Sequence, residues 1–250
     1  MGDGVLKGIR KLIRDGIRSR WASGGVPELP PEVAELISRI RSRNLTYLSE
    51  SKLVRLSDTC REIEALRIPG MFLEAGCALG GSVILIASLK NAKRPLHVYD
   101  VFGMIPAPTK DDTPDVHARY RTIADGQSKG LGDDRYYGYM EDLFSVVHAN
   151  LVSFGIDCDR QSVAFIKGLV QDTMTINQPV AFAHVDVDWY DPVITCLKRI
   201  FPHLVPGGSV ILDDYHDWGG CRKATDEFLR GVVGQFRADD SGGSLRITKR

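Results

Sequence analysis

The sequence has no CxxC pair, no long apolar run and no excess of charge of either sign. Its five cysteines are scattered over 250 residues and odd in number, which argues against structural zinc or a disulfide framework and favours a reducing, cytoplasmic location. Thirty-two basic residues balance 32 acidic ones, so no general attraction to nucleic acid is expected. No apolar stretch reaches the roughly 18 residues of a spanning helix, and the first residues lack a signal-peptide pattern.

Two common phosphate-binding motifs are also missing. The glycines of Glu74–Ser82, EAGCALGGS, fall at positions 76, 80 and 81, which is not the GxGxxG of a dinucleotide site. GxxxxGK[ST] is absent as well, and this excludes a P-loop. An NAD-dependent oxidoreductase is therefore the weakest functional hypothesis.

Apolar runs and turn signals alternate along the chain in the order of an α/β fold. This alternation predicts one doubly wound, mostly parallel, Rossmann-like sheet over residues 45–250. The predicted strands are Met71–Ala75, Leu96–Asp100, Val163–Lys167, one from Ala181, one from Ser209 after a turn at Pro206–Gly208, and Ser244–Lys249. The predicted helices are Glu32–Ser42, Leu45–Leu66 with Ser49 or Ser51 as N-cap, Val83–Leu89, Glu141–Phe154, Val193–Phe201 and Gly219–Arg230.

Two regions are expected to lie outside this regular pattern. Residues 1–44 are predicted to form a helical extension and a linker. Within them, Val5–Trp21 alternates apolar and basic residues at helical spacing, which fits packing on its own domain, on a second subunit, or association with a membrane surface. Gly8 and Gly16 weaken an autonomous helix and favour packing. Residues 101–140, rich in proline, glycine and charge, are predicted to be lid loops.

A nucleoside site is expected where the first predicted strand meets its helix. Strand, glycine turn, helix, strand and terminal acid follow one another as in a nucleotide-binding unit. Asp100, twenty residues after Gly80, is placed to bind a ribose diol. A glycine turn without a phosphate cradle suits S-adenosylmethionine, which has a ribose and an amino acid but no phosphate, and Glu74 could reach its amino group. The expected cofactor-binding residues are Glu74, Gly76, Gly80, Ser82, Asp100 and, near the adenine, Asp172.

Acids gather at the ends of two predicted strands. Ala181–Asp191, AFAHVDVDWYD, passes from an apolar run to three acids, and Ser209–Tyr215, SVILDDY, stops at two more. The carboxyl ends of parallel strands share one edge of a sheet, where open α/β sheets bind ligands. Carboxylates that close repel one another unless a cation lies between them, and their hard oxygens suit Mg²⁺. The sequence therefore predicts a hard-metal site.

Neighbouring residues are expected to have supporting roles. Asp191, before Pro192, is expected to cap the next helix. His184 precedes the acids on a buried strand, and we expect it to pack or to support them rather than act as a base. Trp218 follows the second group of acids and either stacks on a ligand or packs in the core.

From about Leu45 to Lys249 the sequence resembles the macrocin O-methyltransferase (TylF-like) family of S-adenosylmethionine- and magnesium-dependent sugar methyltransferases. The matching stretches are LEAGCALGGS, YDVFGMIPAP, KGLVQDT, HVDVDWYDP, PGGSVILDDYHDWGGCRKATDEF and RITKR. The resemblance implies a class I methyltransferase fold and, together with the apolar N-terminal residues, a homodimer. It also implies that Asp186, Asp213 and Asp214 bind Mg²⁺ and that Asp188 is the general base.

The activity implied by this resemblance is methylation of a sugar hydroxyl. The acceptor would be a small saccharide or glycoside, either a glycosylated natural product or a mannoside precursor of a methylated polysaccharide. Tyr136, Tyr137 and Tyr139 fit an aromatic lid over a neutral saccharide. Two alternatives stay open: a catechol-type Mg²⁺-dependent O-methyltransferase, and a non-catalytic S-adenosylmethionine-binding scaffold.

Overall fold

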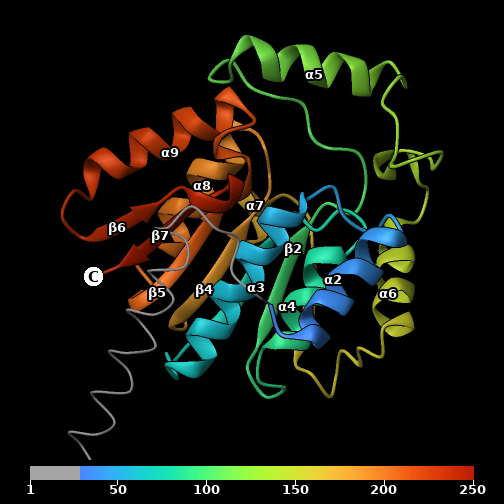
Figure 1. The fold of residues 1–250 in the computed structure, drawn as a ribbon. Helices are drawn as coiled ribbons and strands as arrows, with labels where there is room; N and C mark the ends of the chain where they lie inside the picture. Colours follow the sequence, from blue (N-terminus) through green and yellow to red (C-terminus); the bar gives the residue numbers. More distant parts are fainter. Residues whose placement is uncertain (1–28) are drawn as a thin grey trace, which may run out of the picture.

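Seven strands form one sheet at the centre of the computed structural model, which describes residues 29–250 (Figure 1). The strands are β1 (Met71–Ala75), β2 (Leu96–Asp100), β3 (Val163–Lys167), β4 (Val180–Val185), β5 (Leu204–Leu212), β6 (Phe236–Asp239) and β7 (Leu245–Lys249). Their order is β3-β2-β1-β4-β5-β7-β6, with β1 to β5 parallel and β7 antiparallel to both neighbours. The predicted mostly parallel, Rossmann-like sheet is confirmed.

Helices cover both faces of the sheet. One apolar core lies under α2 (Pro31–Ser42), α3 (Glu50–Ala65), α4 (Gly81–Leu89) and α6 (Leu143–Ser153), and the other under α7 (Val170–Thr173), α8 (Tyr190–Ile200) and α9 (Gly219–Gly231). Because strand side chains alternate between faces, Phe72 enters the first core and its neighbour Leu73 the second. Every residue of β1 and β4 is buried, as their nearly continuous apolar sequences predict for inner parallel strands.

Local differences from the prediction have identifiable causes. Pro206–Gly208 lies inside β5 rather than in a turn, because the β4–β5 register shifts there and Gly207 takes a φ of 84°. The α8 helix begins at Tyr190 with Trp189 as N-cap, so Asp191 lies in the first turn instead of capping the helix. β6 was not predicted, because FRAD is almost wholly exposed and has no alternation of apolar residues.

The predicted lid loops contain one further helix, α5 (Pro114–Ala124), which crosses above the carboxyl ends of the strands (Figure 1). Pro114 stands at its start, where the missing amide hydrogen costs nothing. Val116 and Ile123, two turns apart, are its buried residues. This helical spacing is present in the sequence, but the surrounding prolines and charged residues led to the prediction of loops.

The structure describes only the second part of the predicted N-terminal extension, from residue 29 on. Val5–Trp21 lies outside the described residues. α2, assigned above to the extension, places Val33, Ile37 and Ile40 in the first apolar core beside α4. Among residues 29–250, no helix is both long and apolar enough to cross a membrane.

Candidate active site

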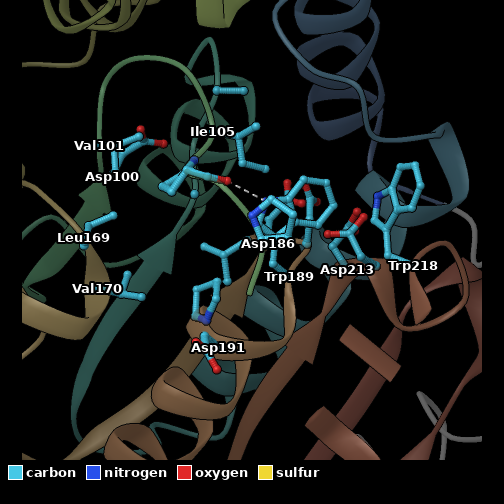
Figure 2. Close-up of a pocket in the computed structure, with 18 of the residues that line it drawn as sticks. Asp100, Val101, Ile105, Leu169, Val170, Asp186, Trp189, Asp191, Asp213 and Trp218 are labelled. Carbon is cyan, nitrogen blue, oxygen red and sulfur yellow. Dashed lines mark hydrogen bonds between the residues drawn. The ribbon is translucent and has the colours of Figure 1, made fainter. Parts of the chain in front are cut away.

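A cavity of about 370 Å³ opens at the carboxyl ends of the parallel strands, where the sequence places its acids. Figure 2 shows Asp100, Leu169 and Val170 on one side, Asp213 and Trp218 on the other, and Asp186 between them. The first side is built by the β1 and β2 ends and by α7. The second is built by the β4 and β5 ends and by the lid segment 103–137.

The glycine turn is pressed against the strand that carries the acids. Gly76 has a φ of 81°, and a Cβ built on it would lie 1.9 Å from the carbonyl oxygen of Asp186. The Asp186 amide donates to the Ala75 carbonyl oxygen at 2.8 Å, which keeps the two strand ends together. Gly80, with a φ of 88°, is the N-cap of α4. Only glycine at position 76 allows this approach.

Substitution of Gly76 by alanine is therefore expected to destabilise the fold by about 3 kcal/mol or more, because both the positive φ and the contact with the backbone are lost. Gly155→Ala is the matched control: its φ is 77°, but nothing lies within 4 Å of its added Cβ. It should cost about 1 kcal/mol. Urea unfolding of both variants measures the difference, and equal losses would show that the Asp186 contact is unimportant.

Asp100 lies on the cavity wall with its carboxylate held in one orientation. The Cys77 amide donates to its Oδ2 at 2.7 Å, and the Phe102 amide donates to its Oδ1 at 2.6 Å. Burial raises its pKa, while these backbone hydrogen bonds oppose the rise. Each oxygen keeps a second lone pair, so the carboxylate can still accept from a diol.

The other residues expected around the methyl donor lie elsewhere. Glu74 is 0% exposed and does not line the cavity; its Oε1 accepts from the Ser82 hydroxyl at 2.5 Å. The contact with the donor's amino group that was expected of Glu74 therefore stays a prediction. Gly80 and Ser82 act through the turn and not on the wall, and Gln171 lines the cavity in place of Asp172.

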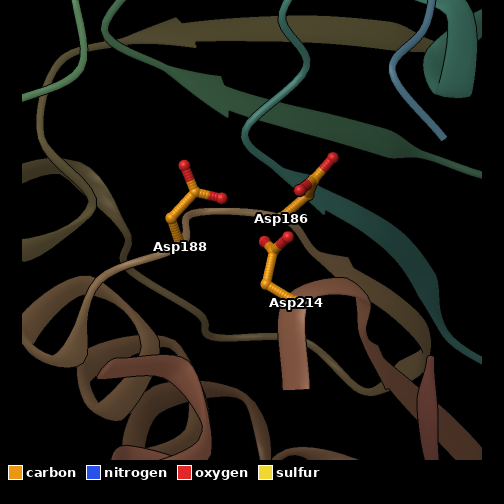
Figure 3. A group of neighbouring side chains, drawn as sticks. All are labelled: Asp186, Asp188 and Asp214. Carbon is orange, nitrogen blue, oxygen red and sulfur yellow. The ribbon is translucent and has the colours of Figure 1, made fainter. Parts of the chain in front are cut away.

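Three of the predicted acids come together at one point. One oxygen from each of Asp186, Asp188 and Asp214 lies within 4.8 Å of the others (Figure 3). A second group with the same spacing joins Asp213, Asp214 and Asp217. The structure therefore brings Asp188, the expected base, next to Asp186 and Asp214, and it places the expected ligand Asp213 beside Asp217.

The backbone that carries Asp188 is unusual. Asp188 has a φ of 56°, which few residues other than glycine adopt. The chain turns sharply here, with the Trp189 amide donating to the Val187 carbonyl oxygen at 2.6 Å. Such a conformation costs on the order of 1 kcal/mol and is concentrated at functional sites. It holds the Asp188 side chain on the cavity wall next to the other acids.

The electrostatics of the acid cluster favour a bound cation. Burial raises the pKa values of Asp186, Asp188 and Asp214, and neighbouring carboxylates raise those of Asp186 and Asp214 further. Asp214 Oδ2 is buried with no hydrogen-bond partner among the described residues. Hard carboxylate oxygens and an unsatisfied acceptor are the donor set that Mg²⁺ takes in proteins, so the residues present fit this ion.

Asp213 differs from its neighbours because it faces cations. Lys52 Nζ, from α3, lies 2.8 Å from its Oδ2 and 2.6 Å from Asp217 Oδ2. Burial alone would raise the pKa of Asp213, but His184 and Lys52 hold it below the usual range. His184 is itself buried, yet Glu74 and Asp213 outweigh burial and raise the pKa of its imidazole well above the ordinary value. Lys52 gave no signal in the sequence, because one lysine in an amphipathic helix is usually solvated.

Aromatic rings form the remaining wall. Trp189 and Trp218 pack edge to face with centroids 5.9 Å apart, and the Trp189 indole donates to the Pro106 carbonyl oxygen at 2.9 Å. The rings of Tyr136 and Tyr137, which also line the cavity, have centroids 4.5 Å apart. Of the three tyrosines expected to form an aromatic lid, Tyr136 and Tyr137 line the cavity, together with Trp189, and Tyr139 does not.

Residues 41–233 match the family model described as Macrocin-O-methyltransferase (TylF). The chain belongs to this family. It is therefore an S-adenosylmethionine-dependent O-methyltransferase, as the resemblance in the sequence implied.

Characterised relatives and solved structures agree with this assignment to the TylF family. The mycinamicin III 3''-O-methyltransferase of Micromonospora griseorubida is 29% identical over 212 residues, covering 79% of this chain and 71% of the relative. The 8-demethyl-8-(2,3-dimethoxy-alpha-L-rhamnosyl)-tetracenomycin-C 4'-O-methyltransferase of Streptomyces olivaceus is 28% identical over 211 residues, covering 82% and 70%. The fold matches the O-methyltransferase NovP with a TM-score of 0.68 at 20% identity, over 82% of both chains.

In this TylF-family enzyme the lid is fixed to the helices that follow the acids. Asp112 Oδ1 accepts from the Tyr190 amide at 2.7 Å, at the start of α8. Asp115 Oδ2 accepts from the Gly219 amide at 2.9 Å, at the start of α9. Arg119, on the same lid helix, lines the cavity with its guanidinium 5.8 Å from the centre of the Tyr136 ring. The sequence gave no indication of these roles, because each depends on a contact between distant segments.

Proposed function

We propose that this methyltransferase methylates a hydroxyl of a sugar, with Mg²⁺ held by the acids of the cavity. The observation that carries the proposal is the group formed by half-buried Asp186 and Asp188 and buried Asp214, which line the same cavity as Trp189, Trp218, Tyr136 and Tyr137. Two relatives support the sugar, because one is named a mycinamicin III 3''-O-methyltransferase and the other a 4'-O-methyltransferase of a rhamnosyl tetracenomycin.

The donor would lie along the first side of the cavity. S-adenosylmethionine supplies a methyl group on a sulfonium sulfur. The fixed Asp100 carboxylate would accept hydrogen bonds from its ribose hydroxyls, because Asp100 lines the cavity and two backbone amides hold its carboxylate in one orientation. Leu169 and Val170 offer an apolar surface for the adenine, and Gln171 offers an amide beside them. The turn at Gly76 brings backbone, without a side chain, close to the amino-acid end.

The metal would be held by Asp186, Asp213 and Asp214, the three ligands that the family resemblance implies. A bound Mg²⁺ supplies positive charge that makes a nearby hydroxyl more acidic. A sugar hydroxyl has a pKa far above 7, so it is a poor nucleophile until its proton is removed. Asp188 would accept that proton, since its side chain lines the cavity beside Asp186 and Asp214. Lys52 would keep Asp213 ionised for the same purpose.

The acceptor would lie against the second side. The faces of a pyranose ring carry C–H groups, which pack well on indole and phenol rings, and Trp189, Trp218, Tyr136 and Tyr137 provide such rings. A neutral glycoside fits this wall, whether the sugar is a deoxysugar of a natural product or a mannoside. The homodimer expected from the sequence remains part of the same proposal.

A methyl-transfer screen tests this function. The enzyme, labelled S-adenosylmethionine and Mg²⁺ are incubated with mono- and disaccharides, partly methylated saccharides, glycosylated macrolides and simple catechols. We expect transfer to saccharides or glycosides and a loss of turnover when EDTA removes the metal. Turnover on catechols alone would replace the sugar with the catechol alternative. Full turnover in EDTA would remove the metal from the proposal, and S-adenosylmethionine binding without any turnover would favour a scaffold.

A further inference from the structure

A row of buried polar groups crosses the sheet beneath the acid cluster. Glu74 on β1 and His184 on β4 are register partners on adjacent parallel strands, and Asp213 follows the end of β5. The side chains of Glu74 and His184 are both 0% exposed, and that of Asp213 is 5% exposed. Polar groups this deep in a methyltransferase sheet need a reason, because an apolar residue would cost less to bury.

The distances within the row show how the groups act on one another. His184 Nδ1 lies 3.1 Å from Glu74 Oε1, which fixes the ring orientation. The other nitrogen, Nε2, points at Asp213 Oδ1 from 3.7 Å, just beyond hydrogen-bond length. Neither Nε2 nor Oδ1 has another hydrogen-bond partner among the described residues. Two unsatisfied buried atoms facing each other would form a hydrogen bond after a shift of a few tenths of an ångström.

Asp213 is thus approached from two sides. Its Oδ2 is bonded to Lys52 at 2.8 Å, and Lys52 reaches out toward Asp217 and the cavity. Its Oδ1 faces inward, toward His184. His184 does not line the cavity, so it cannot contact an acceptor or act on one as a base. Any influence it has on the chemistry must pass through Asp213.

We propose that His184, itself held by Glu74, is the positioning residue of Asp213. It fixes the direction of this carboxylate, so that Asp213 joins Asp214 at the metal instead of turning fully toward Lys52. Carboxylates that bind metals generally need such a hydrogen-bonded support, and losing it weakens metal binding by about 10–100-fold. The inference rests on the proposed function, because it assumes a cation among the acids.

The same row reaches the methyl-donor turn. The oxygen of Glu74 that contacts His184 also accepts from Ser82, in the first turn of α4. One carboxylate oxygen therefore contacts both the helix that follows the glycine turn and the imidazole that faces Asp213. This explains why a glutamate, buried and out of reach of the cavity, stands at the end of β1.

Binding of Mn²⁺ alone, followed by its electron paramagnetic resonance signal, tests the proposal. His184→Asn keeps an amide near Glu74 but cannot reach Asp213, so it should weaken Mn²⁺ binding by about 10-fold or more. His184→Gln extends its amide about as far as Nε2 and should recover most of that loss. S-adenosylmethionine affinity should change less than about 2-fold in both, since His184 does not line the cavity and contacts the donor turn only through Glu74. His97→Asn on β2, outside the row, is the matched control and should bind Mn²⁺ like the wild type.

The results distinguish failure of the proposed metal site from failure of the proposed role of His184. If the wild type binds no Mn²⁺, the proposed metal site itself is wrong. If the wild type binds and His184→Asn binds equally well, or if the asparagine and glutamine variants lose affinity to the same extent, His184 does not position Asp213. Should His184→Asn fail to fold, Glu74→Gln carries the test: it keeps the shape of Glu74 but weakens its hold on the ring. Unchanged Mn²⁺ affinity in that variant would overturn the proposal.

Discussion

Substitution of Asp214 by asparagine is expected to lower kcat/KM for methyl transfer by at least about 10³-fold, since charge stabilisation by a metal contributes several kcal/mol and each ~1.4 kcal/mol is a factor of ten. Asp214 belongs to both groups of acids and carries the unsatisfied Oδ2. S-adenosylmethionine affinity, measured by calorimetry, should survive, because Asp214 lies at the end of β5, away from the donor turn. Asp159→Asn removes an exposed acid and is the control for the loss of one charge. Near-normal turnover in Asp214→Asn would show that the acids hold no catalytic metal.

The same substitution should stabilise the metal-free protein. The folded-state pKa of Asp214 lies well above its unfolded value, because burial and the acids around it disfavour its charge. Its contribution to stability is therefore fully present below the unfolded pKa and is lost as pH rises through the folded pKa. Asparagine does not ionise, so Asp214→Asn should lose less stability between about pH 4 and neutral pH. Thermal unfolding in EDTA over that range would reveal this opposite effect on stability and activity.

Asp188→Asn is expected to reduce kcat by about 10²–10⁴-fold, the usual contribution of a general base, with little change in KM for either substrate. Asparagine is the suitable replacement because Asp188 has a φ of 56°, and asparagine tolerates this conformation better than most residues. The backbone turn that also places Trp189 should then persist. Single-turnover rates and Mn²⁺ binding separate the two possible roles. Loss of Mn²⁺ binding in Asp188→Asn would make Asp188 a metal ligand and not the base.

Much of the fold could be predicted because the relevant signals are local. Short apolar runs such as Ala181–Val185 favour buried strands, and glycines at 76 and 80 mark a turn. The convergence of Asp186 with Asp214 followed from one topological rule, since adjacent parallel strands end at the same edge. The rule predicts which acids lie near one another but not how their side chains are oriented. It could not divide the acids into two groups, or pair Asp213 with a lysine 161 residues away.

What the sequence could not give are contacts made by single side chains between distant segments. Glu74 was expected to reach the donor's amino group, and nothing in the sequence pointed to its buried contact with His184, its register partner on β4. Trp189 had no predicted role, and the turn at Asp188 brings it to the cavity. Arg119 lies on α5, which was not predicted because its sequence is surrounded by prolines and charged residues. In each case a tertiary contact decided the role.

The construction of the cavity side formed by segment 103–137 affects how acceptor preference can change within the family. Much of that side comes from one continuous stretch, between Gly103 and Tyr137, whereas the donor turn and the acids belong to the sheet. The stretch begins and ends beside the core and is fixed by short hydrogen bonds to the starts of α8 and α9. A graft of this single segment from a homologue could therefore transfer acceptor preference and leave the chemistry untouched. Exchange of this segment between homologues would also change acceptor preference during evolution.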